Sequence, residues 1–269
     1  MSGIELVVTD LDGTLWRHDS DIHPAVTTAV RRLEEMGIPL LVATGRRVGS
    51  TRAPLARIGL APPAVVLNGS LGLHLADGRR FHHAPFAPDD ARAALGAFRS
   101  AGLSPCVYVD HADYEVALGD SPSTNPGHIA DLASGAVTAD LDEVVANLPV
   151  LAFSVIGVAH GTLAPAASAL DGVASAYLDR ALDYPGMAAL TVEPLSQSKW
   201  DGVVSFCRHH GVDASRVLAV GDGPNDTELL KNASVAVAPG NGHPAALAHA
   251  DHTVPPPDEG GWAEILELL

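Results

Sequence analysis

Short runs of aliphatic and β-branched residues recur along the first part of the chain, and each run ends in polar residues or glycine. We expect buried strands at residues 4–9, 38–43 and 64–67. Between these runs, apolar residues recur at helical spacing over residues 24–36 and 48–58. Because the strands alternate with helices, the pattern predicts a doubly wound, parallel α/β sheet of the Rossmann-like type.

The pattern changes after the third strand. Residues 71–83 read as a β-hairpin, and residues 84–189 mix helical and strand patterns as in an α+β domain. The alternation of the first part then resumes, with strands expected at residues 217–220 and 235–238. The sequence therefore predicts a discontinuous α/β core, residues 1–83 and 190–269, with an inserted α+β cap at residues 84–189.

Composition restricts the partners and the compartment. The chain has 16 Lys and Arg against 32 Asp and Glu, a formal net charge of −16, which argues against binding to nucleic acid. Two cysteines imply no disulfide framework, and the sequence has no long apolar segment and no secretory signal pattern. We expect a cytoplasmic protein that binds neither nucleic acid nor membrane, and the sequence does not predict its oligomeric state.

Polar residues follow the predicted strands where ligands bind in open parallel sheets. Three aspartates, Asp10, Asp12 and Asp222, offer the hard oxygen ligands that Mg²⁺ prefers. A threonine hydroxyl beside a glycine offers donors to phosphate oxygens, a lysine supplies a compact positive charge, and further candidates lie at the same strand and helix ends. Together these residues are Thr44, Gly45, Arg46, Asn68, Lys199, Asn225 and Asp226.

Taken alone, each of these residues has a simpler interpretation. An Asp-x-Asp sequence can form a turn or cap a helix, and a threonine at a strand end can be a cap. Asp226 can stabilise the first turn of a helix, Asn68 can form an Asn-Gly turn, and Arg46 can be a solvated cation. The sequence also leaves open whether Arg46 or Arg47 faces the site. We do not interpret the 13 histidines as metal ligands.

Four motifs in this order resemble those of the haloacid dehalogenase-like phosphohydrolase superfamily. They are Asp10-Leu11-Asp12-Gly13-Thr14-Leu15, Thr44-Gly45-Arg46, Lys199, and Gly221-Asp222-Gly223-Pro224-Asn225-Asp226. The insert after the second motif resembles the Cof-type subgroup, which carries an α/β cap (class IIB) between motifs two and three. One departure is Lys199-Trp200-Asp201-Gly202, where the family often has Lys-Gly.

The resemblance implies roles for these residues. Asp10 would be the nucleophile, and Asp12 would protonate the leaving alcohol and then activate water. Mg²⁺ would bind an Asp10 carboxylate oxygen, the Asp12 backbone carbonyl and Asp222, with Asp226 supporting Lys199 or metal-bound water. The phosphoryl group or the rest of the substrate would contact Thr44, Gly45, Arg46, Asn68, Lys199 and Asn225.

We therefore expect a Mg²⁺-dependent phosphatase that hydrolyses a small phosphomonoester metabolite, such as a sugar phosphate, through an aspartyl-phosphate. The alternatives are a phosphotransferase or phosphomutase with the same intermediate, and a non-catalytic protein that binds a phosphorylated metabolite. The sequence does not identify the metabolite or the cap residues that select it.

Overall fold

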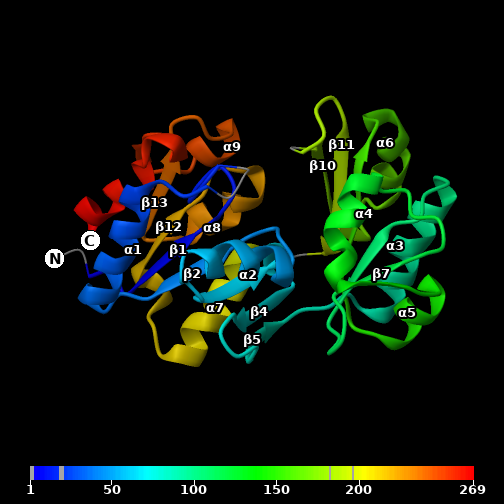
Figure 1. Cartoon of the computed structure of the whole chain (residues 1–269), viewed down its shortest axis with the longest axis horizontal. Coiled ribbons are helices and arrows are strands. Elements are labelled where there is room, and N and C mark those ends of the chain that lie inside the picture. The colour runs from blue at the N-terminus through cyan, green and yellow to red at the C-terminus, as the bar shows by residue number, and fades with distance from the viewer. Residues whose placement is uncertain (1–2, 18–20, 182, 196) are drawn as a thin grey trace. The chain divides into compact units, whose positions relative to one another are not determined.

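The computed structural model describes residues 3–17, 21–181, 183–195 and 197–269. The chain forms two compact units (Figure 1). The first unit combines Met1–His83 with Ser198–Leu269, and the second unit is Ala84–Gln197. Two segments that are distant in sequence therefore build one unit, and the segment between them folds separately.

The first unit is built on an eight-stranded sheet in the order β14-β13-β12-β1-β2-β3-β4-β5. The six strands from β14 to β3 are parallel, and β4 and β5 form an antiparallel hairpin beside β3. The strands are β1 (Leu6–Thr9), β2 (Leu40–Ala43), β3 (Pro63–Val66), β4 (Leu71–His74), β5 (Arg80–His83), β12 (Val217–Val220), β13 (Val235–Pro239) and β14 (His252–Val254). The predicted parallel α/β class is confirmed.

Helices cover this sheet and bury their apolar side chains. The α-helices are α1 (Pro24–Met36), α2 (Val48–Arg57), α7 (Lys199–His210), α8 (Thr227–Asn232) and α9 (Pro244–Leu247). The 3₁₀ helices are η1 (Leu67–Gly69), η3 (Ala214–Arg216), η4 (Pro224–Asp226), η5 (Pro257–Glu259) and η6 (Gly261–Leu268). Helix α7 packs on β2 to β5, whereas α1 packs with η6. Gly37 ends α1 in the left-handed region at φ 70°, where glycine has no steric penalty.

The second unit has a six-stranded sheet in the order β10-β11-β9-β6-β7-β8. Its strands are β6 (Cys106–Val109), β7 (Val116–Leu118), β8 (Ala136–Thr138), β9 (Val150–Val158), β10 (Ala174–Arg180) and β11 (Ala188–Pro194). Its helices are α3 (Pro88–Ser100), α4 (Pro126–Leu132), η2 (Ala133–Gly135), α5 (Leu141–Asn147) and α6 (His160–Ala169). Phe98 of α3 and Phe153 of β9 are fully buried in its separate hydrophobic core.

The second unit extends further along the chain than residue 189. Strand β11 pairs antiparallel with both β9 and β10, and it buries Leu190 and Val192 in the second core. Residues 190–197 therefore lie in the second unit, and the first unit resumes at Ser198. The sequence pattern gave no sign of the sheet in which this strand pairs.

Among the residues whose structure is described, no helix is both long and apolar enough to span a bilayer.

Gly202 should be intolerant of a side chain, because α7 crosses β3 closely at this residue. A Cβ atom there would lie 2.5 Å from Val65 Cγ1. We expect Gly202→Ala to lower the free energy of unfolding of the first unit by about 1–3 kcal/mol through overpacking. Gly96→Ala on α3 is the matched control, because a Cβ there meets nothing within 4 Å. Thermal unfolding of both variants checks this, and an unchanged midpoint for Gly202→Ala would refute the close contact.

Candidate active site

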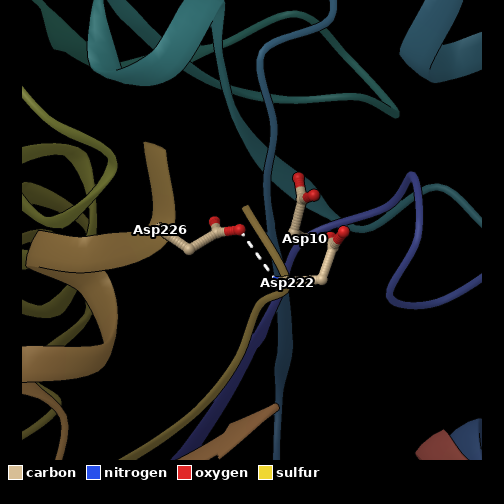
Figure 2. A group of neighbouring side chains, drawn as sticks. All are labelled: Asp10, Asp222 and Asp226. Carbon is tan, nitrogen blue, oxygen red and sulfur yellow. Dashed lines mark hydrogen bonds between the residues drawn. The ribbon is translucent and has the colours of Figure 1, made fainter. Parts of the chain in front are cut away.

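Two parallel strands bring carboxylates together at their carboxyl ends. Asp10 follows β1 and Asp222 lies two residues after β12, its paired neighbour. Asp226 ends the short helix η4 that comes next along the chain. One carboxylate oxygen from each of these three residues lies within 4.8 Å of the other two (Figure 2). Because β1 and β12 are adjacent, aspartates more than two hundred residues apart in the sequence form a compact acidic group.

Lys199 lies between two of these carboxylates. Its Nζ donates to Asp10 Oδ1 at 2.8 Å and to Asp226 Oδ1 at 2.7 Å, and its side chain is fully buried. The lysine is the first residue of α7, whose cap Ser198 donates through its backbone N–H and hydroxyl to Asp201 Oδ2. Asp201, which departs from the family pattern, therefore fixes the turn that carries Lys199.

Gly69 allows the start of α7 to approach the end of β3. A Cβ at Gly69 would lie 2.1 Å from the Ser198 carbonyl oxygen, and its φ is +117°. Both the space and the backbone conformation exclude other residues. This close approach helps to place Lys199 beside Asp10.

Asp226 supports the site with both of its carboxylate oxygens. While Oδ1 accepts from Lys199, Oδ2 accepts from the backbone N–H groups of Gly223 at 2.9 Å and Asp222 at 3.0 Å. Figure 2 shows the bond to Asp222. The loop that carries Asp222 is thereby tied to Lys199 through one side chain. Since these bonds occupy Asp226, the carboxylates best placed to bind a metal directly are those of Asp10 and Asp222.

Thr14 contacts the site but was not among the predicted residues. Its hydroxyl donates to Asp222 Oδ1 at 2.8 Å, and the threonine is buried. Gly13 makes room for this contact, because a Cβ there would lie 2.4 Å from Asp222 Oδ2. The signal was present in the sequence, since Gly13 and Thr14 belong to the first motif, but the sequence alone gave Thr14 no partner.

Burial and charge change the pKa values of these groups. Burial raises the pKa of Asp10 well above its usual value; Lys199 opposes the rise, and Asp226 and Asp222 add to it. Burial and then Asp226 raise the pKa of Asp222 to about 6, against the Thr14 hydrogen bond. Burial lowers the pKa of Lys199, but Asp10 and Asp226 outweigh it and raise that pKa overall. The lysine therefore stays charged, while the excess of negative charge favours a bound cation.

The Asp12 carboxylate binds Arg46 and Trp16, whereas Asp10 and Asp226 bind Lys199. Arg46 binds it through Nε to Oδ2 and Nη2 to Oδ1, both at 2.5 Å, and Trp16 Nε1 donates to Oδ1 at 3.0 Å. The Arg46 guanidinium also lies 5.3 Å from the centre of the Trp16 ring. Of the two adjacent arginines, Arg46 is thus the one that binds a predicted catalytic residue. The sequence did not predict Trp16 as a site residue.

The remaining predicted residues form a polar group at the ends of β2 and β3. The Thr44 hydroxyl accepts from the Arg46 backbone N–H at 3.2 Å, and Asn225 Nδ2 donates to Asn68 Oδ1 at 2.8 Å. Asn68 has φ 49° and ψ 27°, so it is in the left-handed conformation that asparagine tolerates. A Cβ at Gly45 would lie 3.0 Å from Asn68 Oδ1. Asn68 and Asn225 therefore come together from distant segments, beside Gly45.

A buried chain of two hydrogen bonds holds the backbone carbonyl of Asp10. Trp262 Nε1 donates to Thr9 Oγ1 at 2.9 Å, and the Thr9 hydroxyl donates to the Asp10 carbonyl oxygen at 2.7 Å. Both Thr9 and Trp262 are buried. Neither residue was predicted to support the site, because their contact joins the first strand to the last helix.

Comparison with known proteins shows the family to which the chain belongs. The sequence pattern of the haloacid dehalogenase-like hydrolase family matches residues 7–266. The chain therefore belongs to the haloacid dehalogenase-like hydrolases, as its motifs predicted. Its features are those of the Cof-type subgroup, and it is an enzyme, a hydrolase of the type that acts on phosphoric monoesters.

Several of the named relatives are phosphatases. The phosphoglycolate phosphatase of Methanopyrus kandleri is 25% identical over 98% of this chain and 96% of its own length. The 5-amino-6-(5-phospho-D-ribitylamino)uracil phosphatase of Bacillus subtilis is 27% identical over 97% and 96%. The HMP-PP phosphatase of Cronobacter sakazakii is 27% identical over 90% and 86%.

Solved structures share the fold. A haloacid dehalogenase-like hydrolase from Bacteroides thetaiotaomicron is 25% identical, with a TM-score of 0.78 over 98% of this chain and 99% of its own. Another from B. subtilis is 19% identical, with a TM-score of 0.81 over 99% and 100%.

Metal affinity should fall at acidic pH, because protons and a divalent cation compete for the same carboxylates. Below the pKa of Asp222, about 6, the carboxyl group is protonated in the metal-free protein. We expect the dissociation constant for Mg²⁺ or Mn²⁺ to rise about tenfold for each pH unit below that value, and more steeply where Asp10 also takes up a proton. Calorimetric titration measures this, and an affinity independent of pH below that value would exclude Asp222 as a ligand.

Thr14→Val should weaken metal binding without changing side-chain volume much. The valine cannot donate to Asp222, and this hydrogen bond lowers the pKa of that carboxyl group. We expect a loss of about tenfold or more in metal affinity at neutral pH. Thr28→Val is the control, because Thr28 lies on the exposed side of α1 and its hydroxyl donates to the Pro24 carbonyl oxygen. Equal affinities of Thr14→Val and the wild type would show that the contact does not tune the site.

Proposed function

We propose that this chain is a Mg²⁺-dependent phosphatase that hydrolyses a small phosphomonoester metabolite in the cytoplasm through an aspartyl-phosphate. The observation that carries the proposal is the placement of Lys199, which binds Asp10 on one side and Asp226 on the other. This lysine is bound to one oxygen of Asp10, and the second oxygen remains for reaction. Asp222 lies close enough to share a cation with Asp10.

Asp10 performs the first half of the reaction. Its carboxylate attacks phosphorus, the bond between phosphorus and the alcohol oxygen breaks, and the phosphoryl group is carried on Asp10. Lys199 keeps Asp10 oriented and partly neutralises it, because their N–O distance is 2.8 Å. It also places a positive charge where the dianionic phosphoryl group arrives.

Asp12 moves the protons in both halves. It gives a proton to the departing alcohol, and in the second half it takes a proton from the water that attacks the phosphorylated Asp10. The products are orthophosphate and the original Asp10 carboxylate. The side chain of Asp12 is partly exposed, unlike that of Asp10, which suits a group that exchanges protons with substrate and water.

The donor set fits Mg²⁺. Asp10 and Asp222 offer hard oxygens, and the Asp12 backbone carbonyl is the third protein ligand implied by family resemblance. When bound, Mg²⁺ would supply positive charge that offsets the charge of the phosphoryl oxygens. Asp226 would orient the site indirectly, by binding Lys199 and the backbone of the loop that carries Asp222.

Residues at the ends of β2 and β3 would bind the phosphoryl group or the rest of the substrate. The Thr44 hydroxyl and the backbone near Gly45 can donate to phosphate oxygens, as can the amide of Asn225. Asn68 orients that amide by accepting from it. Arg46 supplies a second cation at the partly exposed side of the site.

The substrate class rests on the relatives. The phosphatases above are named for three different phosphorylated compounds, one of which carries a phosphorylated ribityl group. We propose a sugar phosphate as the class of substrate for this chain. The second unit would act as the cap that selects the metabolite, because the motifs all lie in the first unit.

Asp10→Asn and Asp12→Asn should separate attack from proton transfer. We expect Asp10→Asn to abolish phosphate release and acid-stable phosphorylation of the protein, because the amide is a poor nucleophile. We expect Asp12→Asn to lower kcat by about 100-fold or more, because the amide cannot transfer the proton. The variant should still bind Mg²⁺, because the backbone carbonyl of residue 12 is unchanged. The measurements are release of phosphate from a panel of sugar phosphates and p-nitrophenyl phosphate, and calorimetric titration with Mg²⁺.

Two results would contradict the proposal. One is equal activity of Asp10→Asn and the wild type, and the other is equal loss of Mg²⁺ binding in both variants. Asp77→Asn is the matched control, because Asp77 is an exposed aspartate that binds Arg79 in the turn between β4 and β5. It should retain phosphate release. Transfer to an added sugar alcohol in place of water would identify a phosphotransferase.

A further inference from the structure

The side chain of Asp12 is held by three donors from two residues. Arg46 binds both carboxylate oxygens, and the indole N–H of Trp16 donates to one of them. Paired N–H donors on a carboxylate form a strong and directional interaction. In this arrangement Asp12 is directed toward Arg46, and it lies outside the group formed by Asp10, Asp222 and Asp226.

The two cations of the site differ in how readily they can change partners. Lys199 is fully buried between two carboxylates, so removing it from either one would leave a buried charge unpaired. Arg46 and Asp12 have side chains that are each 23% exposed. Water can replace the partners of Arg46 at lower cost.

The formal charge of the site gives a reason for Arg46 to change its partner when substrate binds. Four carboxylates, those of Asp10, Asp12, Asp222 and Asp226, accompany two cations, Lys199 and Arg46. A divalent cation would balance this formal charge, and a dianionic phosphoryl group would then restore an excess of negative charge. The arginine is the cation that can turn toward that group, and its planar fork suits phosphate as well as carboxylate.

From the proposed function and this geometry, we propose that Arg46 is an exchangeable clamp on Asp12. Without substrate, Arg46 holds the Asp12 carboxylate away from the reacting atoms. When a phosphoryl group binds at Asp10, Arg46 transfers to its oxygens and releases Asp12, which takes up a proton from water and then gives it to the departing alcohol. The acid/base residue is thereby made available only when substrate is present.

Trp16 contacts both members of the clamp from a buried position. Its ring is fully buried, the guanidinium of Arg46 lies over it at 5.3 Å, and its N–H is bound to Asp12. The Nη1 group of Arg46 also donates to the Ser50 carbonyl at 3.1 Å. Movement of Arg46 or Asp12 must therefore change the surroundings of the Trp16 indole, which makes that group a local reporter.

The test follows the Trp16 indole by ¹H–¹⁵N NMR. The chain has three tryptophans, and Trp16→Phe identifies the resonance of Trp16. Mg²⁺ and beryllium fluoride are added as the phosphoryl probe, and ¹⁹F NMR shows directly whether the fluoride binds. Spectra are compared for the wild type, Arg46→Lys and the control Arg47→Gln, which removes the neighbouring arginine.

We expect the Trp16 resonance to shift in the wild type and in Arg47→Gln when the fluoride binds. In Arg46→Lys the charge remains but the two-pronged clamp is lost, so the shift should be less than about half that of the wild type. Bound fluoride with equal shifts in the wild type and Arg46→Lys would overturn the clamp. Absence of bound fluoride in the wild type would overturn the proposed function itself, and the clamp with it.

Discussion

The ammonium group of Lys199 is the interaction on which the rest of the site depends. It is fully buried, and it binds Asp10 and Asp226, which are 189 and 27 residues away along the chain. Without this charge, burial and mutual repulsion would favour the protonated forms of the carboxylates. With it, Asp10 is oriented for attack and Asp226 holds the backbone that carries Asp222. One cation thus links the nucleophile, the metal-binding loop and the helix that returns the chain to the first unit.

The fold supplies the precision that this contact needs. Strands β1 and β12 pair in register, so Asp10 and Asp222 emerge from neighbouring strand ends. Gly69 and Gly202 let α7 lie closely against β3, and Ser198 and Asp201 fix its first turn. The side of the site that carries Asp12 is organised differently, through a partly exposed arginine. The buried side therefore holds its geometry, whereas the exposed side can respond to substrate.

The sequence predicted the α/β class, the family and the strand ends that carry the polar residues, because these depend on local patterns and motif order. It placed Asp10, Asp222, Asp226 and Lys199 as candidates, but not the atoms that meet. Thr14, Trp16 and Trp262 were missed because their partners are set by tertiary packing rather than by spacing. For the same reason the pairing of β11, and with it the end of the second unit, was not visible in the sequence.

The central role of Lys199 is tested most directly by the free energy of unfolding, measured as a function of pH for the metal-free wild type and for Lys199→Met. Removing the ammonium leaves Asp10 and Asp226 buried without their partner, which should cost about 3–5 kcal/mol at alkaline pH. Because the pKa of Asp10 is raised in the folded protein, its ionised form destabilises the fold at pH values above the pKa it has in the unfolded chain. The stability deficit of the variant should therefore shrink as pH falls and Asp10 takes up a proton. Equal stability of both proteins at alkaline pH would contradict the central role of Lys199.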